Sequence, residues 1–386
     1  MLLAVTITLT LALSPPPLRS DRRSALKSAA AATAGGLFVP VGSPLALAAE
    51  NDIAYTIPQK TLVAALATAP ARDIVITGSN SGVGLAGAKL LTAAGHRVVL
   101  ACRTQAKADA AAGACQAYAA KASLRSGGAA RGAECDLASL ESVRRFAESM
   151  KAAKMDSLVL NAGLAFGQGE TTPRRTADGF EETIGVNHLG HFLLANLLTP
   201  TLATSTNPRL VVTASPVHDP TSGGGNVGNT ATLGDLSGMA AGKSFEMVDG
   251  GAYDPDKAYK DSKLCNMMFM AEASRRLSSK GITVNAFSPG LIADPNGFFR
   301  YQSKGFASVF NQITKVAGVA ETNEFGGSAL AYLAVDPKVE GVTGTWFDTL
   351  PPGKHQLAVH PASEEARRVE SQQKLWSLSS GLVGLS

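Results

Sequence analysis

The stretch DIVITGSNSGVGLAGAKLLTAAG, residues 73–95, indicates the fold class more clearly than any other part of the sequence. Its first five residues are an apolar run with β-branched side chains, and such a run predicts a strand. Glycines follow directly, and residues 84–95 then have the pattern of a helix. A strand that leads through a glycine-rich turn into a helix is the opening unit of an α/β sheet.

Three glycines in this turn suggest what it binds. We expect Gly78 to allow a sharp turn, Gly82 to let the backbone approach a pyrophosphate, and Gly84 to let the helix pack closely. The N-terminus of the helix would then face the phosphates. The order of strand, glycines and helix therefore predicts a dinucleotide site. The alternative is a glycine-rich turn that binds no ligand.

The alternation of strand and helix continues along the chain. Strands are predicted at 96–102, 132–137, 157–163, 209–215, 282–290 and 344–348, and helices at 104–121, 139–153, 258–279 and 324–335. Apolar strands separated by helices predict a parallel sheet that is covered on both faces. We therefore predict an α/β fold, a single doubly wound Rossmann-type domain with a mostly parallel seven-stranded sheet.

Tyr259 and Lys263 stand four residues apart in the predicted helix 258–279. Residues at this spacing share one face of a helix. A phenol has an ordinary pKa of about 10, and we expect the neighbouring ammonium to lower it and make Tyr259 a usable acid or base. Ser215 follows the fifth predicted strand and could hydrogen-bond a polar substrate atom. The alternative for the pair is an ordinary polar helix face.

Arg103 follows the second predicted strand, where a carboxylate would bind a ribose 2′-hydroxyl. A guanidinium suits a 2′-phosphate instead, so the sequence favours NADPH over NADH. The alternative is that Arg103 is a solvated surface charge.

The pattern Thr-Gly-x-x-x-Gly-x-Gly, followed by NAG (161–163), Tyr-x-x-x-Lys and Pro289-Gly290, resembles the short-chain dehydrogenase/reductase family over roughly residues 72–350. The resemblance implies an oxidoreductase in which Tyr259, Lys263, Ser215 and Asn187 are catalytic. Asn187 would hold a water-linked route to Lys263, and Asp136 would bind the adenine. The implied cofactor site consists of Gly78, Asn80, Ser81, Gly82, Val83, Gly84, Arg103, Asp136, Leu137, Asn161, Ala162, Gly163, Tyr259, Lys263, Pro289, Gly290 and Ile292.

Longer segments resemble one branch of this family, the light-dependent protochlorophyllide reductases. They are NHLGHFLLANLL, NVGNTATLGDLSG, MVDGGAYDPDKAYKDSKLCNMM, NGFFR and the terminal LWSLSSGLVGLS. The resemblance implies light-driven hydride transfer from NADPH to a tetrapyrrole C=C bond in chlorophyll biosynthesis, with the proton from Tyr259. Two alternatives stay open: a light-independent carbonyl or retinol-like reductase, and a non-catalytic pigment- or NADPH-binding relative.

The chain departs from this branch after the sixth predicted strand. The branch has Tyr-Pro-Gly-Cys there, whereas this chain has Ser288 for the tyrosine and Leu291 for the cysteine. Asp294 replaces a hydroxyl residue that the family places near the nicotinamide carboxamide.

Residues 216–257 separate Ser215 from Tyr259 and are predicted to form a long insertion in the domain 72–350. Long irregular connections in compact domains are usually functional. We expect this one to cover a bulky substrate like a lid; the alternative is a tolerated surface insertion.

Residues 1–48 are predicted to be a targeting presequence. A short apolar run ending in prolines is followed by a basic segment rich in Ser and Ala, a pattern typical of a signal plus a transit peptide. We expect a plastid location, in the stroma or at the thylakoid surface, while Arg22-Arg23 leave the thylakoid lumen as an alternative. A secretory signal with a disordered spacer is the other alternative. We further predict a linker at 49–71 and a C-terminal extension with a helix at 351–386.

Composition limits the partners. The formal net charge of +4 on 386 residues is small, whereas nucleic-acid binding needs a concentrated basic surface. His, Cys and carboxylate residues show no ligand spacing, so no metal is expected. The expected partner is a bulky small molecule of tetrapyrrole type, and peripheral thylakoid association and a homo-oligomer are further possibilities.

Overall fold

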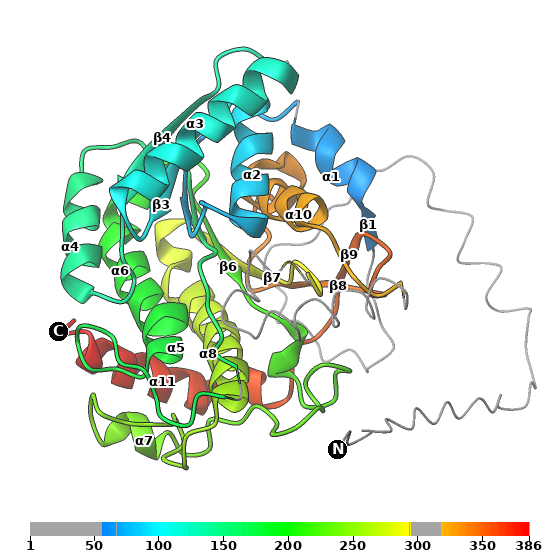
Figure 1. Cartoon of the computed structure of the whole chain (residues 1–386). Helices are drawn as coiled ribbons and strands as arrows, with labels where there is room; N and C mark the ends of the chain where they lie inside the picture. The colour runs from blue at the N-terminus through cyan, green and yellow to red at the C-terminus, as the bar shows by residue number, and fades with distance from the viewer. Residues whose placement is uncertain are drawn as a thin grey trace, which may run out of the picture. The chain divides into compact units, whose positions relative to one another are not determined.

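The computed structural model contains a nine-stranded sheet with helices on both faces (Figure 1). It describes residues 56–66, 68–122, 124–167, 169–292, 294 and 318–385, all of which belong to one compact unit. The predicted presequence lies outside the described residues.

The sheet has the order β1-β9-β8-β7-β6-β5-β2-β3-β4. The parallel strands are β2 (Asp73–Thr77), β3 (Arg97–Cys102), β4 (Ala129–Glu134), β5 (Ser157–Leu160), β6 (Arg209–Thr213), β7 (Thr283–Phe287) and β8 (Trp346–Thr349). They correspond to the seven predicted strands and confirm the fold class.

Two further strands correct the predicted strand number. β9 (Gln356–Val359) pairs antiparallel with β8, and β1 (Thr56–Pro58) pairs antiparallel with β9. Both are short, and β1 includes a proline, which a sheet tolerates at its edge. Their sequences therefore carry almost no strand signal.

The prediction of a linker at 49–71 was wrong for residues 56–66. Besides β1, this segment forms helix α1 (Gln59–Leu66). Leu62 and Leu66 are buried in the same hydrophobic cluster as Phe325 and Leu330. An eight-residue helix has too few turns to show a periodic pattern, so only its packing reveals it.

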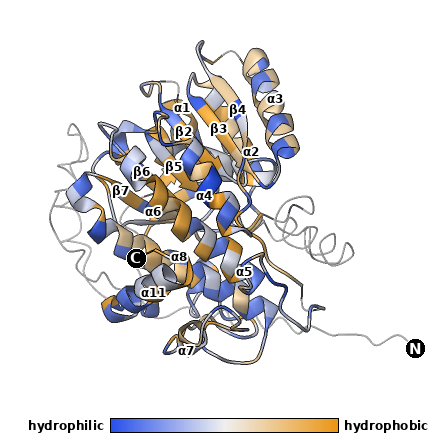
Figure 2. Ribbon diagram, turned by 90° about the vertical axis from the view of Figure 1, so that its left-hand side faces the viewer, coloured by the Kyte–Doolittle hydropathy of each residue, from blue (hydrophilic) through white to orange (hydrophobic). Residues whose placement is uncertain are grey.

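Each face of the sheet is covered by its own helices. One layer contains α1, α2 (Gly82–Ala93), α3 (Gln105–Ala122) and α10 (Asn323–Val335). The other contains α4 (Leu140–Ser149), α6 (His191–Leu202), α8 (Pro255–Arg276) and α11 (Val369–Leu382). In Figure 2, β3 and α6 are coloured mostly hydrophobic, whereas the outer helix α3 mixes hydrophilic residues with its alanines.

Short elements connect these layers. They are α5 (Glu182–Ile184), the π-helix η1 (Gly185–Gly190), α7 (Ser237–Ala240) and the 3-10 helices η2 (Pro216–His218), η3 (Ser278–Lys280), η5 (Pro337–Val339) and η6 (Glu365–Arg367). Among the described residues, no helix has the length and apolar character that crossing a bilayer requires.

The insertion 216–257 has two parts. Its second part contains α7 and contributes side chains to the hydrophobic core, including Leu233, Met239, Phe245 and Val248. Residues from its first part, 216–228, line the large cavity at the carboxyl ends of the strands, together with Pro255 and Asp256 at the start of α8. The second part is therefore anchored to the domain, and the first is positioned to cover a ligand.

Because Leu62 is fully buried, we predict that Leu62→Ala lowers the free energy of unfolding by about 2–5 kcal/mol, the range for removing a buried leucine side chain. Urea unfolding measures this change. The exposed neighbour Lys60 provides the control, since Lys60→Ala should change stability by less than about 0.5 kcal/mol. Equal, small effects of both substitutions would contradict the assignment of α1 to the folded domain.

Candidate active site

The turn after β2 leaves no room for side chains at two of its glycines. Gly78 has φ +65°, and a Cβ there would lie 2.6 Å from the Cα of Ala162. A Cβ on Gly84 would lie 2.5 Å from Nδ2 of Asn161 and 2.7 Å from the carbonyl oxygen of Gly78. Gly84 thus packs against its own turn and the loop after β5. Gly82 differs, because its φ of +54° is the constraint, while a Cβ there would meet Oδ1 of Asn323 at an ordinary contact distance of 3.6 Å.

The hydroxyl of Thr77 joins this turn to the loop after β5. Its Oγ1 accepts hydrogen bonds from the backbone N–H groups of Asn161 (2.9 Å) and Ala162 (3.0 Å). Nε2 of His191 lies 2.8 Å from the same oxygen. Since both lone pairs are used, the hydroxyl donates to Nε2, and Nδ1 of His191 donates to the carbonyl of Asn187 at 3.1 Å. Burial lowers the pKa of His191 to about 4, which agrees with a neutral ring.

The described residues enclose one large cavity of about 2560 Å³ at this edge of the sheet. A pocket for one small ligand typically measures about 300–1,000 Å³, so this cavity has room for two. Every residue of the expected cofactor site lines it, and so does Ser215. Asn187 is the exception among the expected site residues, because it lies behind the cavity wall, fully buried.

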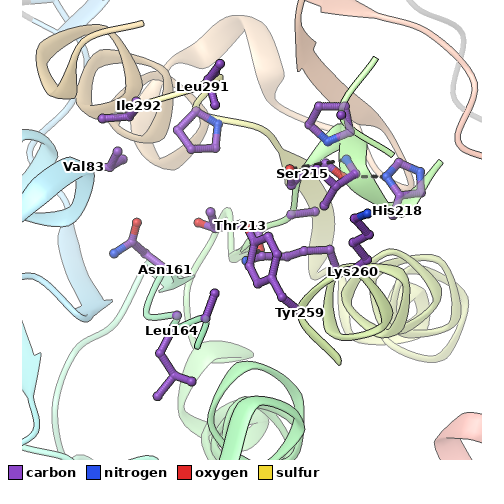
Figure 3. Close-up of a pocket in the computed structure, with 18 of the residues that line it drawn as sticks. Val83, Asn161, Leu164, Thr213, Ser215, His218, Tyr259, Lys260, Leu291 and Ile292 are labelled. Carbon is purple, nitrogen blue, oxygen red and sulfur yellow. Dashed lines mark hydrogen bonds between the residues drawn. The ribbon is translucent and has the colours of Figure 1, made fainter. Parts of the chain in front are cut away.

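Tyr259, Lys263 and Ser215 come together in the cavity wall. Figure 3 shows Val83 and Asn161 on one side of the cavity and Tyr259 and Ser215 on the other. Nζ of Lys263 lies 5.5 Å from the centre of the Tyr259 ring. It donates to the carbonyl of Thr213 at 3.4 Å, and the side chain of Ser215 hydrogen-bonds Tyr259.

The expected lowering of the Tyr259 pKa was wrong. Burial raises the pKa of Tyr259 above its ordinary value, and the hydrogen bond with Ser215 opposes this only in part. Burial also lowers the pKa of Lys263 to about 8. Desolvation disfavours the charged form of both groups. The sequence spacing showed the proximity of the two side chains but not their removal from water.

Asn187 is held by contacts with the backbone. Its Oδ1 accepts from the N–H of Leu164, and its Nδ2 donates to the carbonyl of Leu164, both at 2.9 Å. Nδ2 also lies 3.0 Å from Oγ of Ser262, the residue before Lys263. Asn187 lies in the π-helix η1, a distortion that often marks functional sites. The side chain therefore fixes the loop after β5 to the helix that carries Tyr259.

At the other end of the cavity, Arg103 is exposed and lines the wall together with Lys107. Asp136 accepts from the N–H of Ala138 at 3.1 Å and faces the same space. Lys107 was not anticipated from the sequence, although its position one helical turn after Arg103 could have suggested it.

The loop after β7 is held by its own polar residues. Ser288 is buried, and its Oγ accepts from the N–H of Gly290 at 3.1 Å. Gly290 has φ +81°, and a Cβ there would lie 2.4 Å from Cγ of Glu321. Leu291 lines the cavity with 36% of its surface exposed. Oδ2 of Asp294 accepts from Asn323 at 2.9 Å. Ser288 is thus a structural residue, and Leu291 faces the ligand space.

Two lysines of α8 attach the insertion to the catalytic helix. Lys257 donates to the carbonyl of Thr232 at 2.9 Å and forms ion pairs with Asp249 (3.0 Å) and Asp261 (2.6 Å). Lys260 donates to carbonyls of the insertion and pairs with Asp256 at 2.8 Å. These contacts hold the insertion beside Tyr259.

Lys263 provides a prediction on stability. Its pKa is about 8 in the folded chain against an ordinary 10.5, so the fold binds this proton more weakly than the unfolded chain does. The free energy of unfolding therefore falls as pH drops from 10.5 toward 8 and stays lowered below that. Lys263→Met should abolish activity and raise the free energy of unfolding of the ligand-free protein at pH 7 by about 1–3 kcal/mol.

Urea unfolding at pH 7 and at pH 10 tests this expectation, and the gain should shrink at the higher pH. The exposed Lys280 is the matched control, because Lys280→Met should leave stability almost unchanged at both values. A clear loss of stability in the Lys263 variant at pH 7 would contradict it.

The model of the short chain dehydrogenase family matches residues 72–227. Among solved structures, an uncharacterised protein from Mycobacterium paratuberculosis is 27% identical with a TM-score of 0.57, covering 83% of this chain and 97% of that one. The Pseudomonas aeruginosa RhlG/NADP active-site complex, at 20% identity and a TM-score of 0.53, covers 75% and 98% and shares the fold.

Curated relatives match over most of their length. The chain is 39% identical to the chloroplastic protochlorophyllide reductase of Pisum sativum, over 81% of this chain and 78% of the relative. It is 40% identical to protochlorophyllide reductase A of Triticum aestivum, over 81% and 80%, and 39% identical to the enzyme of Chlamydomonas reinhardtii, over 83% and 80%. The chain is therefore an oxidoreductase of the short-chain dehydrogenase family and belongs with the protochlorophyllide reductases.

Proposed function

We propose that the chain is a light-driven, NADPH-dependent reductase that adds a hydride and a proton across a C=C bond of a protochlorophyllide-type tetrapyrrole, in chlorophyll biosynthesis. The observation that carries this proposal is the single cavity, which joins the glycine-rich turn to Tyr259 and has room for two ligands. The insertion that lines its substrate end belongs to the region matched by the relatives named protochlorophyllide reductase.

The family uses a nicotinamide cofactor, and the residues present fit one. Gly78 and Gly84 keep the turn close to the loop after β5, and Gly82 lines the cavity at the N-terminus of α2. Arg103 and Lys107 add two cations at the adenosine end, which supports a 2′-phosphate and hence NADPH. When bound, NADPH supplies the hydride. Asn161, Pro289 and Ile292 would hold its nicotinamide end.

Tyr259 is the proposed proton donor. Its raised pKa keeps the phenol protonated at neutral pH, as a donor requires. In the proposed reaction Tyr259 would give its proton to one carbon of the double bond, and the neighbouring carbon would take the hydride that bound NADPH supplies, so that the bond becomes single. Lys263 and Ser215 stabilise the phenolate that remains until solvent returns a proton. Leu291 has no exchangeable proton, so the proton is assigned to Tyr259 alone.

The location is proposed from the relatives and from residues 1–48. All three relatives named above are described as chloroplastic. A presequence at 1–48 is consistent with import into a plastid. We propose the stroma or the stromal thylakoid surface, because reduced nicotinamide cofactor is supplied there. The proposal includes peripheral association with the thylakoid membrane and a homo-oligomer.

Cofactor choice can be tested at Arg103. Replacing Arg103 and Lys107 together by glutamine removes both cations beside the proposed 2′-phosphate. Each charge-assisted hydrogen bond contributes about 1.5–3 kcal/mol, so we expect the Kd for NADPH to rise by at least about tenfold while the Kd for NADH stays unchanged. Cofactor fluorescence measures both constants. The control is Lys121→Gln, at the far end of α3, the helix that also carries Lys107. Equal weakening of NADPH and NADH binding would contradict the assignment.

The reaction can be tested at Tyr259. Purified full-length protein is mixed with NADPH and protochlorophyllide, and absorption spectra are compared in the dark and after a flash. The reduced pigment should form only after the flash. Tyr259→Phe should lower the yield by at least about 10²-fold, the scale of general-acid catalysis, without loss of pigment binding. Tyr253→Phe is the matched control, since Tyr253 does not line the cavity.

Other outcomes separate the alternatives. No conversion under light, together with carbonyl-dependent NADPH oxidation in the dark, would replace the proposal with a light-independent reductase. Pigment binding without turnover, unchanged in Tyr259→Phe, would indicate a non-catalytic binding protein.

A further inference from the structure

His218 connects the catalytic serine with the C-terminal part of the chain. It ends the 3-10 helix η2, which follows Ser215 directly. Only 1% of its surface is exposed. Figure 3 shows its ring pointing toward the backbone of Ser215, on the same side of the cavity as Tyr259. His218 is not among the site residues expected from the sequence.

The hydrogen bonds of His218 fix both its tautomer and its orientation. Its Nε2 accepts from the backbone N–H of Ser363 at 3.3 Å. A backbone N–H can only donate, so Nε2 is unprotonated, and Nδ1 carries the hydrogen. Nδ1 therefore donates to the carbonyl of Ser215, which lies 2.7 Å away. Burial lowers the pKa of His218, in agreement with a neutral ring.

These contacts control where Ser215 presents its side chain. Its carbonyl also accepts from the backbone N–H of His218, at 3.2 Å. Its Oγ receives a long hydrogen bond from the N–H of Val217, at 3.4 Å, and bonds the side chain of Tyr259. The backbone of Ser215 is thus held more firmly than its hydroxyl. Moving that carbonyl would move the hydroxyl relative to Tyr259.

The other partner of His218 belongs to a segment that faces the ligand. Residues 360–364 and Arg367 all line the cavity. The ring of His218 also packs edge-on against the buried Trp346, with centroids 5.4 Å apart. The ring is therefore confined between β8 and the segment 360–367. A substrate in this end of the cavity would contact the segment that holds Nε2.

We propose that His218 is a positioning residue. By linking the carbonyl of Ser215 to the C-terminal segment 360–367, it holds the Ser215 hydroxyl in place relative to Tyr259. The inference rests on the proposed function, because it takes Ser215 to contact the substrate. It adds that the segment 360–367 is part of the active-site assembly, although it lies far beyond the catalytic helix in the sequence.

Two isosteric substitutions separate the two hydrogen bonds. In His218→Asn the amide nitrogen takes the place of Nδ1, so the donor to Ser215 is kept and the acceptor for Ser363 is lost. In His218→Gln the amide oxygen takes the place of Nε2, so the acceptor is kept and the donor is lost. Both variants lose the ring beside Trp346, and each is therefore the control for the other in that respect.

We expect His218→Gln to lower kcat by about tenfold, the scale of one lost hydrogen bond, with KM for protochlorophyllide nearly unchanged. His218→Asn should keep kcat near that of the unmodified chain and instead speed hydrogen exchange at the Ser363 amide. Equal losses of kcat in both variants would overturn the proposal, since they would reflect only the missing ring.

A double-mutant cycle tests whether His218 acts through Ser215. In a Ser215→Ala background, His218→Gln should lower kcat less than twofold further, because coupled residues are not additive. An undiminished tenfold loss would overturn the proposal. A purely structural role would leave the two effects additive.

One readout is independent of turnover. If the unmodified chain converts no pigment, the proposed function fails, but the ring of His218 can still be examined. ¹⁵N–¹H spectra of protein labelled at its histidine rings, assigned with His218→Gln, should show Nδ1 protonated and Nε2 unprotonated across neutral pH. A proton on Nε2 would exclude the link to Ser363 and overturn the inference.

Discussion

The close approach of two turns, at the ends of β2 and β5, is the constraint on which the rest of the site depends. Thr77 accepts two backbone hydrogen bonds from the β5 turn with one hydroxyl, and Gly78 leaves no space for a Cβ against Ala162. The order of strands reverses between β2 and β5, where open α/β sheets bind ligands. The same contact reaches α6 through His191, so the cofactor turn and the π-helix that carries Asn187 share one hydrogen-bonded network.

Burial sets the chemistry of the catalytic helix. Burial shifts the pKa of Tyr259 up and that of Lys263 down to about 8, because removal from water disfavours the charged form of each. By contrast, Lys257 keeps its charge through Asp249 and Asp261. One helix thus holds a lysine with a raised pKa that attaches the insertion and, less than two turns away, a lysine with a lowered pKa beside Tyr259. The difference lies in the surroundings and not in the side chain.

Part of this arrangement could be predicted from the sequence. The turn 78–84 was recognisable because only glycine tolerates its positive φ values and close contacts, and the seven parallel strands followed from long apolar runs. β4 begins at Ala129, earlier than predicted, because AARGAE has little β preference. The direction of the Tyr259 pKa shift was wrong, since spacing along a helix carries no information on solvent access. The contact of His218 with Ser363 spans 145 positions, and no local pattern encodes it.

The pairing of β1 with β9 has a consequence for the order in which the molecule can form. It joins Thr56, near the start of the described chain, to Ala358, near its end. The last part of the chain also supplies Ser363 to His218 and α11 to the surface of α8. The early strands can collapse with their own helices, but β1 has no strand to pair with until β9 is in place. The active site is therefore completed last, and a chain truncated before β9 would hold the cofactor turn without a finished substrate pocket.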